Sequence, residues 1–291
     1  MTICPDCDAP MEWISPGSPY LCPMCYRSYP TNETITYLAP SHTLDTTASF
    51  PSDSFEQLLL TEERHFWFKS RGDILEKLLE AYIKTGSKFL EIGCGNGYML
   101  ARLSHIGASL HGADLFLDAL KFCRSRLPSI PLFMLDINKL PFKEEFDSIG
   151  IFDVLEHIED DIGSLSQIHR ALKPGGYLLV TVPAYPFLWG PPDTAAFHKR
   201  RYTRNQLSSR LRSAGFKVDR LTFFNSFLFP LLVVSRIWQK KNIYSSQKSL
   251  ELQISPFLNK ILGKIMSAEK AILRWANFPV GGSLLAICHR D

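Results

Sequence analysis

The sequence predicts an α/β fold, a doubly wound sheet of parallel strands preceded by a small N-terminal module. A glycine-rich turn follows an apolar run at residues 88–97, and apolar runs that end in acids recur at residues 109–114, 132–137 and 146–153. Two CxxC pairs within the first 25 residues predict the module. A chain of 291 residues with 45% apolar residues can fold one domain of about 200 residues with one appendage.

The glycine-rich turn is the first candidate ligand site. Glycine leaves positive φ open and lets backbone N–H groups approach a ligand closely. Asp114 ends the next strand, about twenty residues after Gly95, at the separation where such folds place a carboxylate on ribose hydroxyls. The pattern predicts a nucleoside site, and a turn that binds nothing is the alternative. The residues of the turn are Glu91, Gly93, Cys94, Gly95, Asn96 and Gly97.

Four of the seven cysteines form two CxxC pairs near the N-terminus. Two such turns can each present two thiolates and fill a tetrahedral zinc shell with no open position, which is the arrangement of a structural site. We therefore expect a zinc ribbon over residues 1–32, with redox or unligated cysteines as the alternative. The expected Zn²⁺ ligands are Cys4, Cys7, Cys22 and Cys25.

Charge and the first residues bear on partners and location. A net charge of +3 is too small to demand a nucleic-acid partner and does not exclude one. The first residues lack the basic region and apolar core of a secretory signal. We therefore expect a cytoplasmic protein, in a reducing compartment where paired cysteines bind metal.

Between the module and the sheet, composition and periodicity change twice. Residues 33–54 are rich in Thr, Ser and Pro and predict a linker, with one strand at residues 34–38. Apolar residues at helical spacing then run over residues 55–68 and end in the aromatic cluster HFWF. A second helix is predicted over residues 71–84, before the first strand of the sheet.

These motifs, in this order, resemble the class I S-adenosylmethionine-dependent methyltransferases. EIGCGNG (residues 91–97) looks like their cofactor loop, and FDVLEHIED (152–160) with LKPGGYLLVTVP (172–183) looks like their fourth strand, helix and fifth strand. The resemblance implies a Rossmann-like, seven-stranded sheet in the order 3-2-1-4-5-7-6 over residues 55–291. It implies S-adenosylmethionine as the cofactor. In many such enzymes a segment like HFWF lies across the cofactor mouth, and plain packing on the core is the alternative.

The resemblance also implies how the cofactor is held. Glu91 and the loop Gly93 to Gly97 would hold the methionine end, with backbone amides facing its carboxylate and the acid near its ammonium. Asp114 would accept both ribose hydroxyls. Leu115 or Phe116 would pack on the adenine.

Two further strand ends would complete the cofactor site. Asp136 would accept a hydrogen bond from the adenine amino group, and Ile137 would supply a backbone amide. Asp153 and Val154 would line the wall near the reacting methyl group. Each acid has the alternative reading of a helix cap or turn former.

Methyl transfer from a sulfonium leaves a neutral leaving group, so no metal is required and positioning supplies most of the rate. A base is needed only if the acceptor must lose a proton. The candidates are His157, just past the fourth strand, and His198 with Tyr202 beside it, after the fifth strand. A hydrogen-bonded wall residue is the alternative for each histidine.

The segment from Ala184 to Tyr202 is long for a loop inside a compact domain, which is typical of a functional loop. Its aromatic residues and its cations predict a lid over an anionic, partly apolar acceptor, to which Arg200 and Arg201 could bind in a bidentate manner. The alternative is a solvated basic helix start capped by Thr203.

Residues 223–280 form an apolar insertion followed by an amphipathic stretch. The apolar run is interrupted by polar residues and is shorter than the roughly 20 residues that span a bilayer. Three interpretations stay open: a wall of an apolar acceptor pocket, a hairpin on the membrane surface with cations on anionic lipid, and a dimer contact. The second would make the protein peripheral to the membrane.

The acceptor is the least determined part of the function. An apolar insertion and an aromatic lid favour a small-molecule or lipid-linked acceptor. The alternative is a ribosomal RNA base, because certain guanine methyltransferases also begin with a four-ligand zinc module, although Cys25 stands where some of them have histidine. A second alternative is a non-catalytic scaffold that uses the zinc ribbon to hold a partner protein.

Overall fold

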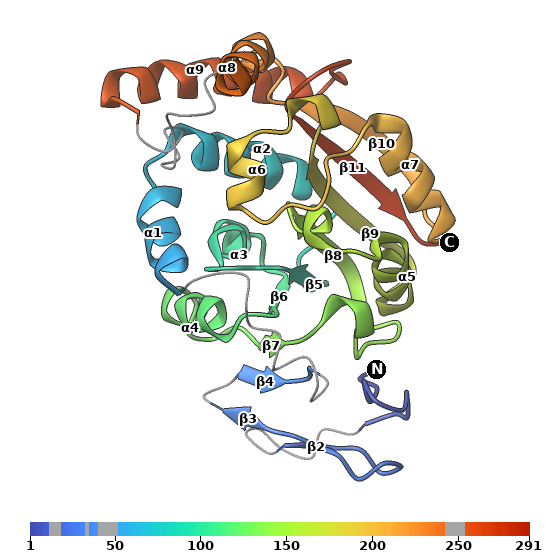
Figure 1. Cartoon of the computed structure of the whole chain (residues 1–291). Coiled ribbons are helices and arrows are strands. Elements are labelled where there is room, and N and C mark those ends of the chain that lie inside the picture. The colour runs from blue at the N-terminus through green and yellow to red at the C-terminus, as the bar shows by residue number, and fades with distance from the viewer. Residues whose placement is uncertain (12–18, 33–34, 40–51, 242–253) are drawn as a thin grey trace.

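The computed structural model describes residues 1–11, 19–32, 35–39, 52–241 and 254–291, and it centres on a nine-stranded sheet (Figure 1). The strand order is β10-β11-β9-β8-β5-β6-β7-β4-β3, and a separate hairpin pairs β1 with β2. The strands are β1 (Tyr20–Leu21), β2 (Ser28–Tyr29), β3 (Thr31–Asn32), β4 (Ile35–Tyr37), β5 (Lys88–Ile92), β6 (Ser109–Asp114), β7 (Leu132–Met134), β8 (Phe146–Phe152), β9 (Leu172–Pro183), β10 (Lys217–Phe224) and β11 (Ser283–His289).

Parallel pairing of β5 with its two neighbours creates the edge where a ligand can bind. Leu90 in β5 lies opposite His111 in β6 and Ile149 in β8. The carboxyl ends of these strands therefore meet at one edge, and loops that follow them come together there. At the far side, β11 runs antiparallel between β9 and β10.

The sheet has nine strands rather than the seven expected, because the N-terminal segment extends it. β4 pairs in parallel with β7, and β3 pairs antiparallel with β4. Ile35 and Leu38 are buried against the sheet, so their apolar side chains favour pairing over a solvated linker. The one strand expected in the linker, at residues 34–38, is thus β4, and it belongs to the main sheet. Residues 33–34 and 40–51 lie outside the described residues.

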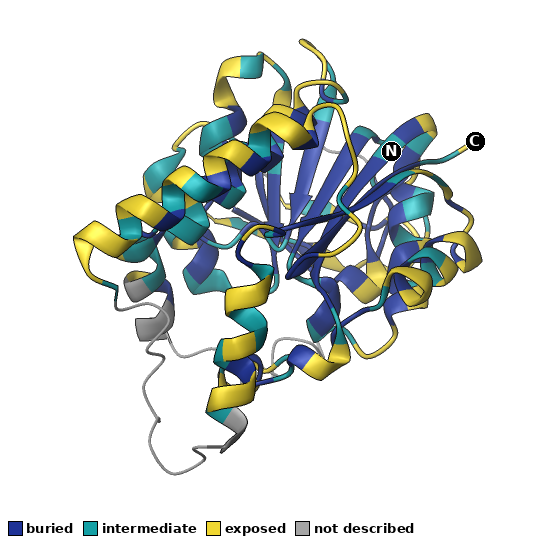
Figure 2. Ribbon diagram, turned by 90° about the horizontal axis from the view of Figure 1, so that it is seen from above, coloured by how far each residue is buried: buried dark blue, intermediate teal, exposed yellow. Residues whose placement is uncertain are grey.

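Helices cover both faces of the sheet, and their buried sides form two apolar clusters. Figure 2 shows the buried strands running between helices that are exposed on their outer sides. One face carries α2 (Phe66–Leu79), α3 (Tyr98–Leu103), α4 (Leu117–Arg126) and α9 (Pro256–Leu273), and the other carries α5 (Asp161–Ala171) and α7 (Arg204–Ser213). The remaining helices are α1 (Ser52–Glu62), α6 (Pro191–Ala195) and α8 (Phe229–Lys241).

The HFWF segment begins α2 and packs against other parts of the domain. This agrees with the alternative that it packs on the core rather than lying across the cofactor site. His65 caps the helix by accepting from the Trp67 amide at 3.2 Å. The Trp67 ring stacks on Phe224 of β10 with centroids 6.1 Å apart. The Phe66 amide donates to Asn259 Oδ1 of α9 at 2.7 Å. The segment therefore anchors α9 and β10. Helix α1, instead, is the N-terminal element that contacts the glycine-rich turn after β5.

The apolar insertion folds as α8 and α9 between β10 and β11, and residues 242–253 lie outside the described residues. Within the described part of the chain, no helix combines the length and the apolar content needed to cross a membrane.

Candidate functional site

The turn after β5 is shaped by glycines at positive φ: 71° at Gly93, 52° at Gly95 and 73° at Gly97. A Cβ added at Gly93 would lie 2.3 Å from the Val154 Cγ2, and one at Gly97 would lie 2.6 Å from the Cys123 Sγ. A Cβ added at Gly95 would meet no heavy atom within 4 Å. Gly93 and Gly97 are therefore packed on protein, whereas Gly95 faces space that a ligand can enter.

The carboxylate of Asp114, at the end of β6, is bonded to this turn. Its Oδ2 accepts a hydrogen bond from the Gly95 amide at 2.9 Å, and its Oδ1 accepts one from the Phe116 amide at 3.0 Å. Burial raises the pKa of Asp114, while the backbone N–H groups oppose that rise. The structure thus joins the glycine turn and the strand-end acid that the sequence pattern paired. Leu115 follows at half-buried exposure.

Glu91 is buried near the end of strand β5, with 4% of its surface exposed. Among the described residues, no group hydrogen-bonds to its Oε2 atom. Burial, and then the nearby Cys123 thiol, raise its pKa well above the usual range, and Arg71 opposes them. A buried carboxyl oxygen without a donor is a candidate partner for a ligand cation.

Helix α1 is tied to the glycine turn after β5. Asn96 is 1% exposed, and its Nδ2 donates to the Phe55 carbonyl of α1 at 2.8 Å. Arg126 donates from α4 to the Asn96 carbonyl and to Glu62 Oε2 of α1, both at 3.1 Å. These bonds fix the position of the loop between two helices, so its amides are held in place before any ligand binds.

Asp136 at the end of β7 takes the cap role that was its alternative reading. Its Oδ1 accepts from the Asn138 amide at 2.9 Å and from the Asn138 side chain at 2.8 Å. These bonds begin the short 3₁₀ turn Ile137–Lys139, in which Ile137 is buried. No bond joins Asp136 to the glycine turn among the described contacts, so its place in a ligand site rests on position alone.

Asp153, at the end of β8, is held by an arginine that sequence reasoning missed. It has a positive φ of 56°. Its Oδ2 lies 2.6 Å from an Arg71 guanidinium nitrogen of α2, and its Oδ1 accepts from Thr181 at 3.1 Å. Val154 next to it contacts Gly93, so this wall and the glycine turn adjoin.

A second cluster lies where the loops after β8 and β9 meet. The rings of His157 and His198 are 4.8 Å apart, and His198 Nδ1 lies 2.9 Å from Asp193 Oδ1. His198 Nε2 is 3.8 Å from Oε1 of Glu156, which is fully buried and has no hydrogen-bond partner on either carboxyl oxygen among the described residues. Ligand atoms of Glu156, His157 and His198 lie within 4.8 Å of one another, close enough to share a cation.

Environment sets the protonation of this cluster. Burial would raise the pKa of Asp193, but hydrogen bonds from His198 and Arg201 lower it to about 2, so the carboxylate stays ionised. Burial and the neighbouring His198 lower the pKa of His157 to about 4. His157 is therefore neutral at pH 7. Burial raises the pKa of Glu156 well above its usual range.

The other lid residues predicted to act in chemistry serve structure instead. Tyr202 is 1% exposed, and its hydroxyl donates to Asp161 at 2.9 Å, while burial raises its pKa. Arg201 donates to Asp193 at 2.7 Å, and Arg200 lies 3.2 Å from Asp161. Both arginines, expected to bind an anionic acceptor, are thus paired with acids inside the protein. The sequence did contain a signal for these pairs, because Asp193 lies in the first turn of α6 and Asp161 begins α5.

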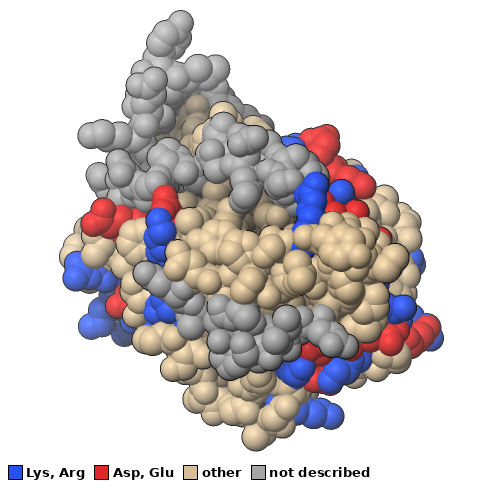
Figure 3. Space-filling view, turned by 90° about the horizontal axis from the view of Figure 1, so that it is seen from below, with Lys and Arg blue, Asp and Glu red and all other residues tan. Residues whose placement is uncertain are grey.

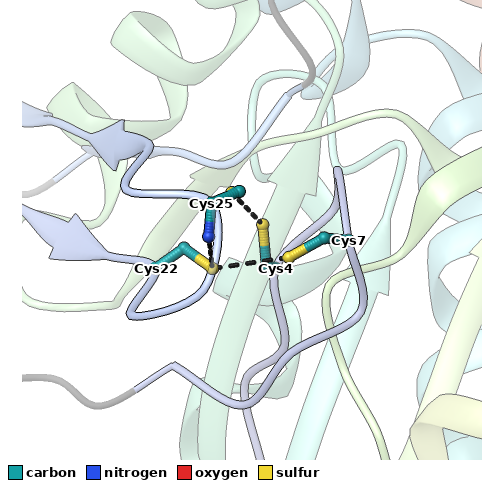
Figure 4. A group of neighbouring side chains, drawn as sticks. All are labelled: Cys4, Cys7, Cys22 and Cys25. Atoms are coloured by element: carbon teal, nitrogen blue, oxygen red, sulfur yellow. Dashed lines mark hydrogen bonds between the residues drawn. The ribbon is translucent and has the colours of Figure 1, made fainter.

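The four N-terminal cysteines point toward one another (Figure 4). The Sγ atoms of Cys4 and Cys25 are 3.6 Å apart, and those of Cys7 and Cys22 are 3.5 Å apart. All four lie within 4.8 Å of one another. Tetrahedral zinc with Zn–S bonds of about 2.3 Å requires S–S distances of roughly 3.8 Å, so this cage fits zinc.

Comparison with known proteins identifies relatives of the larger part of the chain. A family model described as a methyltransferase domain matches residues 61–221, more than half of the chain. A "Probable S-adenosylmethionine-dependent methyltransferase" of Mycolicibacterium smegmatis is 29% identical over 160 residues, covering 54% of this chain and 62% of that protein. The ubiquinone biosynthesis O-methyltransferase of Thiobacillus denitrificans is 29% identical over 203 residues, covering 58% of this chain and 86% of that protein. The chain therefore spans less than two thirds of the first of these relatives.

Solved structures share the fold at low identity. A chain in the complex that contains the Haloferax volcanii Trm112 methyltransferase activator matches with a TM-score of 0.55 and 18% identity, covering 82% of this chain and 94% of that one. The [4+2]-cyclase SpnF matches with a TM-score of 0.50 and 18% identity, covering 75% of this chain and 81% of that one. A cyclase among these neighbours means that the fold does not by itself define the reaction.

Proposed function

Because the chain belongs to the methyltransferase domain family, we propose that it transfers a methyl group from S-adenosylmethionine to a small-molecule or lipid-linked acceptor. One observation carries the proposal: the Gly95 amide is bonded to Asp114 at a turn whose open side can admit a ligand. The same site also contains a buried Glu91 oxygen without a hydrogen-bond donor among the described residues. A scaffold that binds no cofactor would not be expected to keep both features.

The donor set of the site fits the parts of the cofactor. The Asp114 carboxylate is proposed to accept from the ribose hydroxyls, using lone pairs that its two backbone bonds leave available. Glu91 is proposed to pair with the ammonium of the methionine end, which supplies the donor that its Oε2 lacks. In the loop, the amides of Gly93, Cys94, Gly95 and Gly97 already donate inside the protein. The Asn96 amide is therefore the one proposed to face the carboxylate.

The remaining cofactor contacts rest on position at the sheet edge. Leu115 and Phe116 follow Asp114 and are proposed to pack on the adenine. Asp136 and Ile137 would bind its amino edge through the carboxyl oxygen that the cap leaves open. Asp153 and Val154 would form the wall beside the reacting methyl group.

S-adenosylmethionine supplies an electrophilic methyl group when bound, and the residues of the second cluster prepare the acceptor. We assign His198 as the base that accepts the acceptor's proton at Nε2, since Asp193 orients the ring through Nδ1. His157 is the second choice, because its lowered pKa makes it a weak base. The buried hydroxyl of Tyr202 leaves it the role of holding this loop.

Two features favour a small or lipid-linked acceptor over RNA. The Thiobacillus denitrificans relative is named for O-methylation in ubiquinone biosynthesis. Figure 3, a view from below, shows cations and acids mixed around a mainly uncharged centre where the chain is described, rather than a continuous basic surface. RNA recognition depends on such a surface, so RNA stays the second candidate.

We also propose that residues 1–32 bind one Zn²⁺ in a structural role through Cys4, Cys7, Cys22 and Cys25. The support is the sulfur cage, which matches a closed tetrahedral shell. Residues Cys4 and Cys22 belong to the apolar cluster shared with the α5 face. The ion would thus hold the module onto the domain rather than take part in catalysis.

The proposed function is tested with S-adenosylmethionine labelled in its methyl group. The protein is incubated with either a lipid extract or total RNA from the source cells, and label is counted in each. We expect label in the lipid extract, and a variant His198→Gln should lose it while still binding the cofactor. Label in RNA alone would reverse the choice of acceptor, and no transfer to either would leave a scaffold.

A further inference from the structure

Helix α9 has two apolar faces, of which the packing of the domain uses one. Leu262, Met266 and Leu273 are buried beneath it. Roughly 120° around the helix axis, a second stripe of large apolar side chains is exposed to solvent. It consists of Phe257 at 76%, Ile261 at 39% and Ile272 at 42% exposure, and Trp275, just after the end of the helix, continues it at 80%.

Helix α8, which lies with α9 at the top of Figure 1, repeats this feature. Its exposed apolar side chains recur every three or four residues, so they share one side of the helix. Figure 2, which looks down on both helices, shows exposed residues along each of them. The exposed side chains of α8 are Leu231 at 58%, Val234 at 63%, Ile237 at 52% and Trp238 at 59%. We call these residues and the α9 stripe the α8–α9 face.

The exposed charges of α9 and of the residue after it have one sign, while Lys270 of α9 lies 3.6 Å from Asp73 of α2. Lys260, Lys264 and Arg274 of α9 and its C-terminal end are exposed, whereas Glu269, the acid of α9, is fully buried. Glu269 is engaged by the amides of Ser226 and Phe227 at 2.7 and 3.1 Å. An apolar stripe flanked by cations, with exposed tryptophans, is the pattern of a helix that lies in a membrane interface.

Helix α8 contacts the predicted lid, the segment from Ala184 to Tyr202 that carries Asp193 and His198. An added Cβ at Gly190 of the lid would lie 3.0 Å from the Arg236 side chain of α8. The ring of Tyr185, also in the lid, lies 5.6 Å from Phe229 at the start of α8. A surface bound by α8 would therefore lie next to the loop that forms the acceptor side.

We propose that the α8–α9 face docks onto an anionic membrane surface and that the methyl acceptor is taken from that surface. This inference deepens the proposed function and rests on it only for the acceptor. A second copy of the chain fits the face less well, because a two-fold contact would bring the cations of α9 against each other with no exposed acid in the helix.

The test measures co-sedimentation of the full chain with phosphatidylglycerol vesicles and with phosphatidylcholine vesicles. We expect binding to phosphatidylglycerol that weakens with salt, and at least tenfold weaker binding to phosphatidylcholine. Lys260→Glu with Lys264→Glu should weaken binding at least tenfold, whereas Lys143→Glu, an exposed lysine elsewhere, should leave it unchanged. Trp275→Ser with Trp238→Ser should weaken it similarly, and Leu60→Ser, an exposed apolar control on α1, should not.

Calorimetry with S-adenosylmethionine on the same samples separates this inference from the proposed function. Cofactor binding without vesicle binding would overturn docking and leave the proposed enzyme function standing. Vesicle binding without cofactor binding would leave docking standing and overturn the proposed enzyme function. Docking would also be overturned if Lys143→Glu or Leu60→Ser weakened vesicle binding as much as the face variants do. A dimer that dissociates in the Trp275→Ser, Trp238→Ser variant, in protein that ignores vesicles, would assign the face to self-association.

Discussion

His198 Nδ1 lies 2.9 Å from Asp193 Oδ1, and the same carboxylate is fixed by the Gly190 amide at 2.8 Å and by Arg201 at 2.7 Å. An ionised acid held on three sides fixes the orientation of the imidazole and leaves Nε2 available. This is the geometry of a base positioned by a second residue.

Replacing Asp193 tests that relationship. Asp193→Asn keeps the size of the side chain but removes the charge, so His198 loses its fixed tautomer. We expect the rate of methyl transfer to fall about 10²-fold or more, with the affinity for S-adenosylmethionine unchanged in calorimetry. Glu159→Gln, a change at a side chain that is 80% exposed, is the control and should keep full activity. An equal loss of activity in both variants would contradict the proposal that Asp193 positions His198 as the base.

The glycine turn gives a prediction with a matched pair. Gly95→Ala and Gly86→Ala both place a side chain at positive φ in open space, so each should cost about 1 kcal/mol of unfolding free energy. Only the methyl group at residue 95 would enter the proposed cofactor space. Calorimetry should therefore give at least tenfold weaker S-adenosylmethionine binding for Gly95→Ala alone. Equal affinities would mean that the turn does not contact the ligand.

Acid should destabilise the fold through His157. Its pKa is lowered from 6.5 to about 4, so the unfolded chain binds this proton first as pH falls. Stability is unaffected above pH 6.5, falls from there to about pH 4, and then stays level for this group. At about 1.4 kcal/mol per pKa unit, the loss is roughly 3 kcal/mol.

Denaturant unfolding at several pH values measures this loss. His157→Asn should flatten the decline between pH 6.5 and 4, whereas His105→Asn, at a side chain that is 53% exposed, should not. A wild-type slope retained in His157→Asn would assign the decline to other groups.

The N-terminal module should bind about one zinc ion per chain. Cys22→Ser removes one of four ligands, so metal analysis should find little zinc in it, and the chain should melt at a lower temperature. Cys288→Ala, which removes a buried thiol far from the module, should keep the zinc. Zinc-free wild-type protein, purified without chelator, would contradict the ribbon.

The sequence predicted what depends on neighbours along the chain. An apolar run before Gly93 and an acid after the next run were enough to pair Gly95 with Asp114, because parallel strands bring their carboxyl ends together. Asp136 shows the limit of this reasoning, because the same strand-end position also suits a cap. Its hydrogen bonds with Asn138 show that it caps the turn that follows, whatever its other carboxyl oxygen binds.

Contacts between distant segments could not be predicted. A strand was expected at residues 34–38, but its pairing with β7 was not. The ion pair of Arg71 with Asp153, which joins α2 to the end of β8, was not predicted either. The sequence of HFWF suits a position across a cofactor site as well as packing against α9. The structure shows the second, because the Phe66 amide donates to Asn259 of α9. Such contacts depend on how distant segments pack together, and the composition and periodicity of one segment do not reveal its partner.

Titration of the protein with S-adenosylmethionine in a calorimeter tests the central claim most directly. The account predicts that the wild-type chain binds about one cofactor per chain. Asp114→Ala should bind none while its circular dichroism keeps the wild-type spectrum, although the loss of two hydrogen bonds from buried amides should lower its melting temperature. Asp118→Ala on the surface of α4 should bind normally. Absence of binding to the wild-type chain, or an unchanged affinity in Asp114→Ala, would contradict it.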